Sequence, residues 1–152
     1  MAHAAPSKEQ PTASTDLEAG RDLKLGEFAT EETLSLSEAR IVLLKTLDHR
    51  AQHGGQYDEP DNSSKAREYL EIFSIFKDLA LAEQVESLIN TLGGGLEKFE
   101  KSQLKSLVPT CADEAKAVIP SLEKKCEEGV VDEDELDGIC KELQRVKREA
   151  QL

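Results

Sequence analysis

The histidines that could bind a metal, His49 and His53, stand four residues apart, which is one turn of a helix. Metalloprotease helices use this spacing for two zinc ligands and place a catalytic glutamate directly after the first histidine. Here the intervening residues are Arg-Ala-Gln, so that glutamate is missing, and a zinc site needs further ligands. We therefore expect the solvent-facing end of a helix, with no metal ligand and no cofactor bound by this chain.

Two further stretches resemble ligand-binding loops only in part. The run Gly93-Gly94-Gly95 lacks the preceding strand and the Gly-Lys-Ser/Thr of a phosphate-binding loop, so it predicts the end of a helix instead. The segment VVDEDELDG at 130–138 is as acidic as a calcium loop but lacks its ligand spacing and its final glutamate. Its acids suit a helix N-terminus, where the helix dipole favours negative charge.

The three cysteines, Cys111, Cys126 and Cys140, do not indicate a disulfide framework or a zinc site, because their number is odd and no C-x-x-C occurs. They fall on apolar helical positions with no histidine near them in the sequence. Buried, reduced thiols are the expectation, which favours the cytosol or nucleus. With no catalytic constellation left, the sequence favours a protein that is not an enzyme.

Composition and charge narrow the function further. Of the 152 residues, 38% are hydrophobic, 33% are charged and only 4% are aromatic, a profile typical of helical proteins with aliphatic cores. The net charge is −12, and nucleic-acid-binding domains usually carry a basic patch, so tight nucleic-acid binding by this chain alone is not expected. No apolar run approaches the ~20 residues that would span a bilayer, and we expect no membrane partner.

Hydrophobic periodicity predicts an all-α chain, since no stretch alternates with period two. Residues 1–22, rich in Ala, Ser, Thr and Pro, predict a disordered tail. An arm and a helix follow at 23–52, and the Gly, Pro, Asn and Ser of 53–64 predict a loop. Residues 65–150 predict a compact bundle of about five short helices.

The arm and first helix carry more apolar surface than one small domain covers. An extended segment such as 23–28 can add a strand to the sheet edge of another chain. The helix, capped by Ser35 or Ser37 with Glu38 in its first turn, is apolar nearly all round, which favours a partner on one side. The residues expected to contact that partner are Leu23, Leu25, Phe28, Leu36, Ile41, Leu44 and Leu47.

The bundle core follows from helical spacing. Tyr69, Ile72, Phe73 and Phe76 stand at i, i+3, i+4 and i+7, and the last helix opens at Asp132 with a similar apolar series behind it. The predicted core residues are Phe73, Phe76, Leu88, Phe99, Ile119, Leu122, Leu136, Ile139 and Leu143.

Pro120 interrupts the apolar run EAKAVIPSLEKKC at 114–126. Proline cannot donate the N–H of an interior helical position, but its fixed φ suits the first turn of a new helix. We therefore interpret it as a corner that ends one helix at Ile119, begins the next, and sends Leu122 into the core.

Four stretches make the chain similar to a known family: EFATEETLSLSEA, FSIFKDLALAEQVESLI, LEKFEKSQLKSLVPTCADEAKAVIPSLE and DEDELDGICKEL. Together they extend over residues 27 to about 148, and they resemble the small stalk subunits of eukaryotic RNA polymerase II, the fourth subunit of that enzyme. The Ile-Pro-Ser-Leu corner belongs to this resemblance. The resemblance as a whole implies a helical bundle similar to the HRDC-like fold of certain helicases and RNase D.

The resemblance also implies a function. The chain would be a non-catalytic subunit that forms a heterodimer with the seventh subunit and docks on the largest subunits of the polymerase core near the RNA exit path. It would support initiation, contact transcription factors and help to handle the transcript, with RNA bound mainly by the partner's OB barrel. The expected location is the nucleus, with shuttling to the cytoplasm as a further expectation.

Two alternatives stay open at this point. One is the equivalent stalk subunit of another multisubunit polymerase, such as RNA polymerase III or an archaeal enzyme. The other is a free-standing HRDC-type nucleic-acid-binding module. A module of that kind should present a stripe of Lys and Arg, which the acidic excess of this chain does not favour.

Overall fold

The computed structural model describes residues 17–53 and 59–151. Within these ranges the chain is helical, and the one strand-like pairing is a single antiparallel bridge between Glu18 and Lys24, which confirms the all-α prediction. None of the helices described is long and apolar enough to cross a membrane. The elements are a 3₁₀ helix η1 (Gly26–Thr30), α1 (Leu36–His53), α2 (Asp61–Phe73), α3 (Leu79–Leu92), α4 (Lys98–Leu107), α5 (Ala112–Val118), α6 (Pro120–Glu127) and α7 (Glu133–Glu149).

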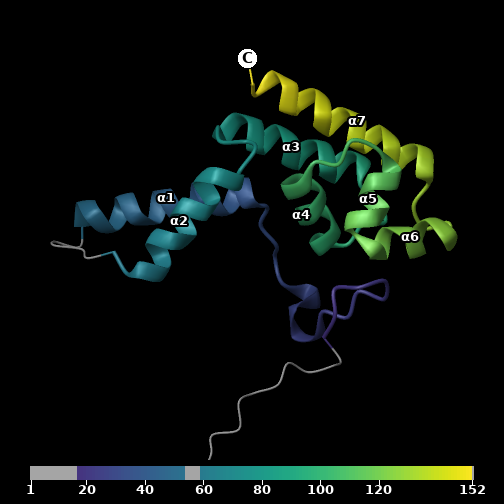
Figure 1. Cartoon of the computed structure of the whole chain (residues 1–152), viewed down its shortest axis with the longest axis horizontal. Coiled ribbons are helices and arrows are strands. Elements are labelled where there is room, and N and C mark those ends of the chain that lie inside the picture. Colours follow the sequence, from purple (N-terminus) through teal and green to yellow (C-terminus); the bar gives the residue numbers. More distant parts are fainter. Residues whose placement is uncertain (1–16, 54–58, 152) are drawn as a thin grey trace, which may run out of the picture.

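The helices form two structural parts (Figure 1). Helices α3 to α7 make a bundle, in which α7 packs along α3 and α5. Helices α1 and α2 lie side by side as a hairpin that projects away from this bundle and touches it through contacts of α1 with α3 and α4. The N-terminal arm lies on another side of the bundle, near α6.

The core of the bundle is aliphatic and centred on α7. Leu136, Cys140, Leu143 and Val146 on that helix have no exposed surface, because they recur at helical spacing on the face turned inward. The corner at Pro120 forms as predicted: Pro120 occupies the first turn of α6. Ile139 of the same helix is also buried. Buried residues from the rest of the chain complete the core: Phe76, Val85, Ile89, Leu96, Leu104, Val108, Ala112, Ala115, Ile119, Leu122 and Val131.

Phe73 corrects the predicted core. Its side chain is 52% exposed, because α2 ends there and the chain turns extended at Ser74, which breaks the helical phase that linked Phe73 to Phe76. Phe99 lies in the first turn of α4 and is only half-buried, while Leu88 packs against the core with part of its surface exposed. The remaining predicted core residues are buried: Phe76, Ile119, Leu122, Leu136, Ile139 and Leu143.

The boundaries also differ from the sequence-based ones. Residues 54–58 of the predicted loop lie outside the described residues, but α1 includes His53 and α2 begins at Asp61, after an extended Pro60. Helix α2 packs on α1, so it does not belong to the bundle predicted at 65–150. None of its residues is buried, and Tyr69, Ile72 and Phe73 are exposed.

The predicted tail, 1–22, is described only from Leu17. Its last residues are ordered by specific contacts: the bridge of Glu18 with Lys24 closes a turn, and Arg21 and Asp22 form ion pairs with α6. Polar composition alone predicts disorder for such a segment. The ion-pair partners on α6 lie 102 residues away in the sequence, so composition does not reveal them. Residues 1–16 lie outside the described part.

Candidate partner-binding surface

The hairpin of α1 and α2 has almost no core of its own. Within the described residues, α1 buries only Ser37 along its 18 positions, and α2 buries none along its 13. Most helical stability in proteins comes from packing an apolar face, and short helices without it are marginal in water. The hairpin therefore exposes apolar surface that a second chain could cover.

Hydrogen bonds fix the first turn of α1 to the rest of the chain. The Ser35 backbone N–H donates to Glu38 Oε2 over 2.6 Å, and the Glu38 N–H donates back to Ser35 Oγ over 3.3 Å, which is a capping box. The Ser74 hydroxyl donates to the Leu36 carbonyl over 3.0 Å, and the Phe76 N–H donates to Ser37 Oγ over 3.1 Å. The connector after α2 is thus held against the start of α1.

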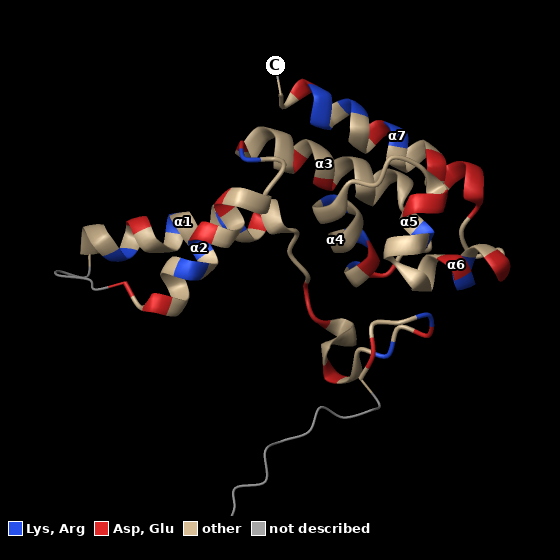
Figure 2. Cartoon of the chain, viewed as in Figure 1, with Lys and Arg blue, Asp and Glu red and all other residues tan. Residues whose placement is uncertain are grey.

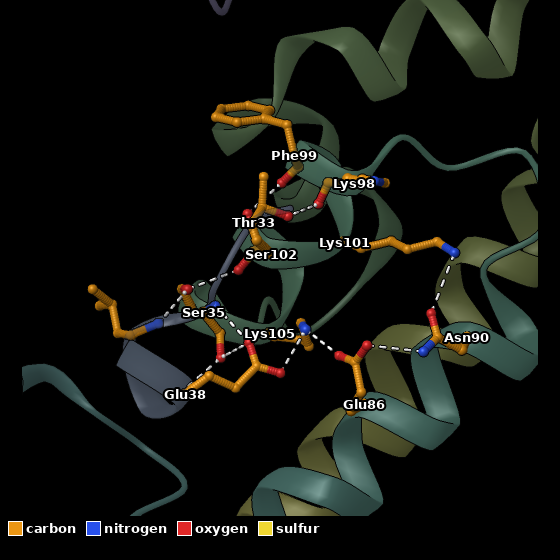
Figure 3. Close-up of polar contacts among 12 residues, drawn as sticks. Thr33, Ser35, Glu38, Glu86, Asn90, Lys98, Phe99, Lys101, Ser102 and Lys105 are labelled. Carbon is orange, nitrogen blue, oxygen red and sulfur yellow. Dashed lines mark hydrogen bonds and ion pairs between the residues drawn. The ribbon is translucent and has the colours of Figure 1, made fainter. Parts of the chain in front are cut away.

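A buried lysine joins the hairpin to the bundle. The Lys105 side chain, 6% exposed, reaches from α4 to pair with Glu38 on α1 over 2.8 Å and with Glu86 on α3 (Figure 3). Burial alone would raise the pKa of Glu86, but hydrogen bonds from Lys105 and Asn90 bring that pKa below its ordinary value. Both carboxylates are therefore held on one cation, and this sets the position of α1 relative to α3.

The predicted contact residues fall into two groups. Leu36, Ile41, Leu44 and Leu47 are all half-buried on α1. Those of the arm lie elsewhere: Leu23 and Leu25 line a hollow of about 340 Å³ beside Ser121 and Lys124 of α6, and Phe28 in η1 is 61% exposed. The structure brings the residues of each group together but does not join the two groups into one patch.

The arm is held to α6 by exposed ion pairs. Arg21 contacts Glu123 over 3.0 Å and also pairs with Glu127, and Asp22 contacts Lys124 over 3.0 Å. Ion pairs exposed to solvent contribute little to stability, so the arm can leave this position at small cost.

Sequence reasoning missed several exposed apolar residues. Tyr69, Ile72 and Phe73 of α2 are each more than half exposed, and the rings of Tyr69 and Phe73 contact one another with centroids 4.6 Å apart. Their spacing identified a helix face correctly but could not show whether the chain itself covers that face. Leu34, Val42 and Leu79 are exposed in the same way around a groove between α1 and α3.

The candidate chemical residues are spread across the fold. His49 and His53 stack on one another at the exposed end of α1, and in the described ranges no three metal-ligating side chains come together. Burial raises the pKa of the Cys140 thiol to about 12 and also raises that of Cys126. A thiol with a raised pKa is a poor nucleophile at neutral pH. All three cysteines are free.

Comparison with known proteins identifies the family. The family model described as RNA polymerase Rpb4 matches residues 33–147, which include both the hairpin and the bundle. The chain belongs to the Rpb4 family.

The run Gly93–Gly95, within this match, ends α3 at Leu92. Gly95 has a φ of +84°, and a Cβ added there would lie 2.9 Å from the Val130 carbonyl oxygen.

Relatives from three organisms are similar to this Rpb4-family chain. The DNA-directed RNA polymerase II subunit rpb4 of Schizosaccharomyces pombe is 36% identical over 128 residues, which cover 83% of this chain and 89% of the relative. RPB4 of Saccharomyces cerevisiae is 36% identical over 113 residues, covering 73% of this chain and 47% of the relative. The Dictyostelium discoideum subunit is 36% identical over 84 residues, covering 55% of this chain and 49% of that relative.

Proposed function

We propose that this chain is the Rpb4 subunit of RNA polymerase II and acts in the nucleus as a non-catalytic stalk subunit paired with the seventh subunit. The names of these three relatives, each a subunit of RNA polymerase II, support this over a subunit of another polymerase. The pair docks on the largest subunits of the core, supports initiation, and helps to handle the transcript. Transcription factors bind its exposed faces, RNA binds mainly through the partner, and the pair shuttles to the cytoplasm.

The observation that carries the pairing is the hairpin without a core. Helices of 18 and 13 residues that bury one serine between them in the described chain gain little from packing. Exposed apolar surface of this extent marks an interface. The partner covers the α1 residues Leu36, Ile41, Leu44 and Leu47. It also contacts the arm residues Leu23, Leu25 and Phe28, of which Phe28 lies in the 3₁₀ helix η1 and so cannot add to a sheet edge as an extended strand.

Co-purification with the seventh subunit tests this pairing. Replacing Ile41 and Leu44 together by Asp places two charges on the half-buried face of α1, and we expect the pair to dissociate on size-exclusion chromatography. The matched control replaces Val118 and Val130, which are 47% and 51% exposed on the bundle, by Asp and should co-elute normally. Circular dichroism should show a helical bundle in both variants. Stoichiometric co-elution of the Ile41→Asp, Leu44→Asp variant would refute the assignment.

A further inference from the structure

A groove between α1 and α3 is lined by apolar residues that the chain leaves uncovered. Its volume is about 570 Å³, within the ~300–1,000 Å³ typical of ligand sites. Ile41 and Ala82 line it, and Leu34, Val42 and Leu79 at its border are 55%, 51% and 42% exposed. Three large aliphatic side chains with this much exposure around one hollow are more than single surface residues, and they indicate a docking site.

The charges around the groove are mostly negative. Four glutamates line it against one lysine, Lys45. Glu32 is compensated by Lys98, but Glu38 and Glu86 share the single cation of Lys105, and exposed Glu83 has no ion-pair partner among the described residues. A negative rim disfavours nucleic acid and anionic lipid and favours a cationic ligand.

The groove cannot close by collapse of α1 onto α3. The Lys105 ion group lies between the two helices, and the Leu36 N–H donates to Ser106 Oγ over 3.1 Å, so α4 holds the start of α1 in place (Figure 3). A pre-formed groove lowers the ordering cost of binding. The contacts from α4 therefore hold the end of the groove that lies at the start of α1, next to Glu38.

We propose that this groove binds a short linear segment of a partner protein that carries aliphatic side chains flanked by lysine or arginine. The aliphatic side chains fill the space bordered by Leu34, Val42 and Leu79, and the cationic groups lie beside Glu83 and Glu86. The inference deepens the proposed function, and rests on it in one respect, because Ile41 belongs both to the groove and to the proposed subunit interface.

Fluorescence anisotropy with synthetic peptides tests the chemistry of the groove on the full chain. The probe is a helix-forming peptide of about three turns with two leucines four residues apart and lysines on either side. One control peptide has glutamate in place of each lysine, and the other has serine in place of each leucine. We expect the probe to bind at least about tenfold more tightly than either control.

Variants of the chain locate the binding. Val42→Asp should weaken binding of the probe peptide by at least about tenfold. Val118→Asp, at a valine of similar exposure on α5, should leave the affinity for the probe unchanged. Glu83→Lys should weaken binding of the lysine-containing probe and strengthen binding of the control peptide that carries glutamate. Lack of probe binding, equal binding of all three peptides, or insensitivity to Val42→Asp would each overturn the inference. Because this assay uses no second subunit, its failure would leave the co-purification result, and the pairing it tests, unaffected.

Discussion

Phe73 and Phe76 are identical residues three positions apart in opposite environments. Phe73 is 52% exposed on α2, whereas Phe76 is 1% exposed in the bundle core. The difference arises at Ser74, where the backbone turns extended and the hydroxyl bonds to the Leu36 carbonyl. One residue between them thus decides which phenylalanine belongs to the core and which to the hairpin surface.

Alanine substitution at these two positions gives a matched comparison. Phe76→Ala should lower the free energy of unfolding by about 3–5 kcal/mol, since it empties a filled core site. Phe73→Ala should change that free energy by no more than about 1 kcal/mol, since its ring already meets solvent. Urea unfolding followed by circular dichroism measures both, and equal losses would show that Phe73 is covered within the isolated chain.

The corner at Pro120 makes a second comparison at this scale. Leu122 has no exposed surface, so Leu122→Ala should lower the free energy of unfolding by about 2–5 kcal/mol. Pro120→Ala acts mainly by freeing the unfolded chain and should cost about 1 kcal/mol or less. The urea midpoint of Leu122→Ala should therefore be clearly the lower of the two, and neither variant should disturb pairing with the seventh subunit. A Leu122→Ala midpoint within error of the wild type would contradict the core position.

At the scale of elements, polar contacts attach the start of α1 to the bundle. The buried residue of α1 in the described structure is Ser37, and Lys105 provides the ionic connection to α1 and α3 together. Such a connection is directional, so it specifies one position of the helix where an apolar contact would tolerate several.

Lys105→Met should therefore be destabilising in a pH-dependent way. Near neutral pH the loss should be about 1–3 kcal/mol, because two carboxylates lose their shared donor. The pKa of Glu86 lies below its ordinary value of 4.5 in the folded chain, so its stabilising contribution is present above that value and is lost as the pH falls through the folded pKa. The difference between wild type and variant should shrink as the pH falls below about 4.5.

The exposed Lys45 provides the control for this experiment. Lys45→Met, on the same helix as Glu38, should change the unfolding free energy by no more than about 0.5 kcal/mol at any pH. Urea titrations at several pH values measure all three proteins. A loss for Lys105→Met that is the same at every pH would exclude the ionic role of this lysine.

How far the sequence predicts these elements depends on how local the cause is. The caps at Ser35 and Asp132, the corner at Pro120 and the periodicity of α7 are set by neighbours within one or two turns, and they were predictable. The assignment of α2 to the hairpin was not, because a face with apolar residues at i, i+3 and i+4 looks the same whether a core, a partner or solvent meets it. The groove was not predictable either, because it depends on the position of α1 relative to α3. Lys105 of α4 sets this position through its ion pairs with both helices.

At the scale of the molecule, charge is interspersed across the elements (Figure 2). The first turn of α7 is acidic and its last turn is basic, as the helix dipole favours. Two basic residues of α7 are already compensated: Arg145 pairs with Glu142 and Glu149, and Lys141 pairs with Asp137. Because these cations are paired and the net charge is −12, the chain offers little basic surface for contacts with phosphate groups.

The isolated chain should therefore bind single-stranded RNA only weakly, with a Kd above about 10⁻⁵ M at physiological salt. Fluorescence anisotropy with a labelled oligonucleotide measures this, and the complex with the seventh subunit serves as the comparison. Submicromolar binding by the chain alone, with a steep dependence on salt, would support the free-standing nucleic-acid-binding module instead.

The most direct test of the account is amide hydrogen exchange of the chain with and without the seventh subunit. In the chain alone, the amides of α2 and of α1 beyond Ile41 should exchange rapidly, while those of α7 between Leu136 and Val146 exchange slowly. Adding the seventh subunit should slow exchange in the hairpin by at least about tenfold and leave α7 nearly unchanged. A complex that forms while the hairpin exchanges as fast as before would contradict the claim that the partner completes this part of the fold.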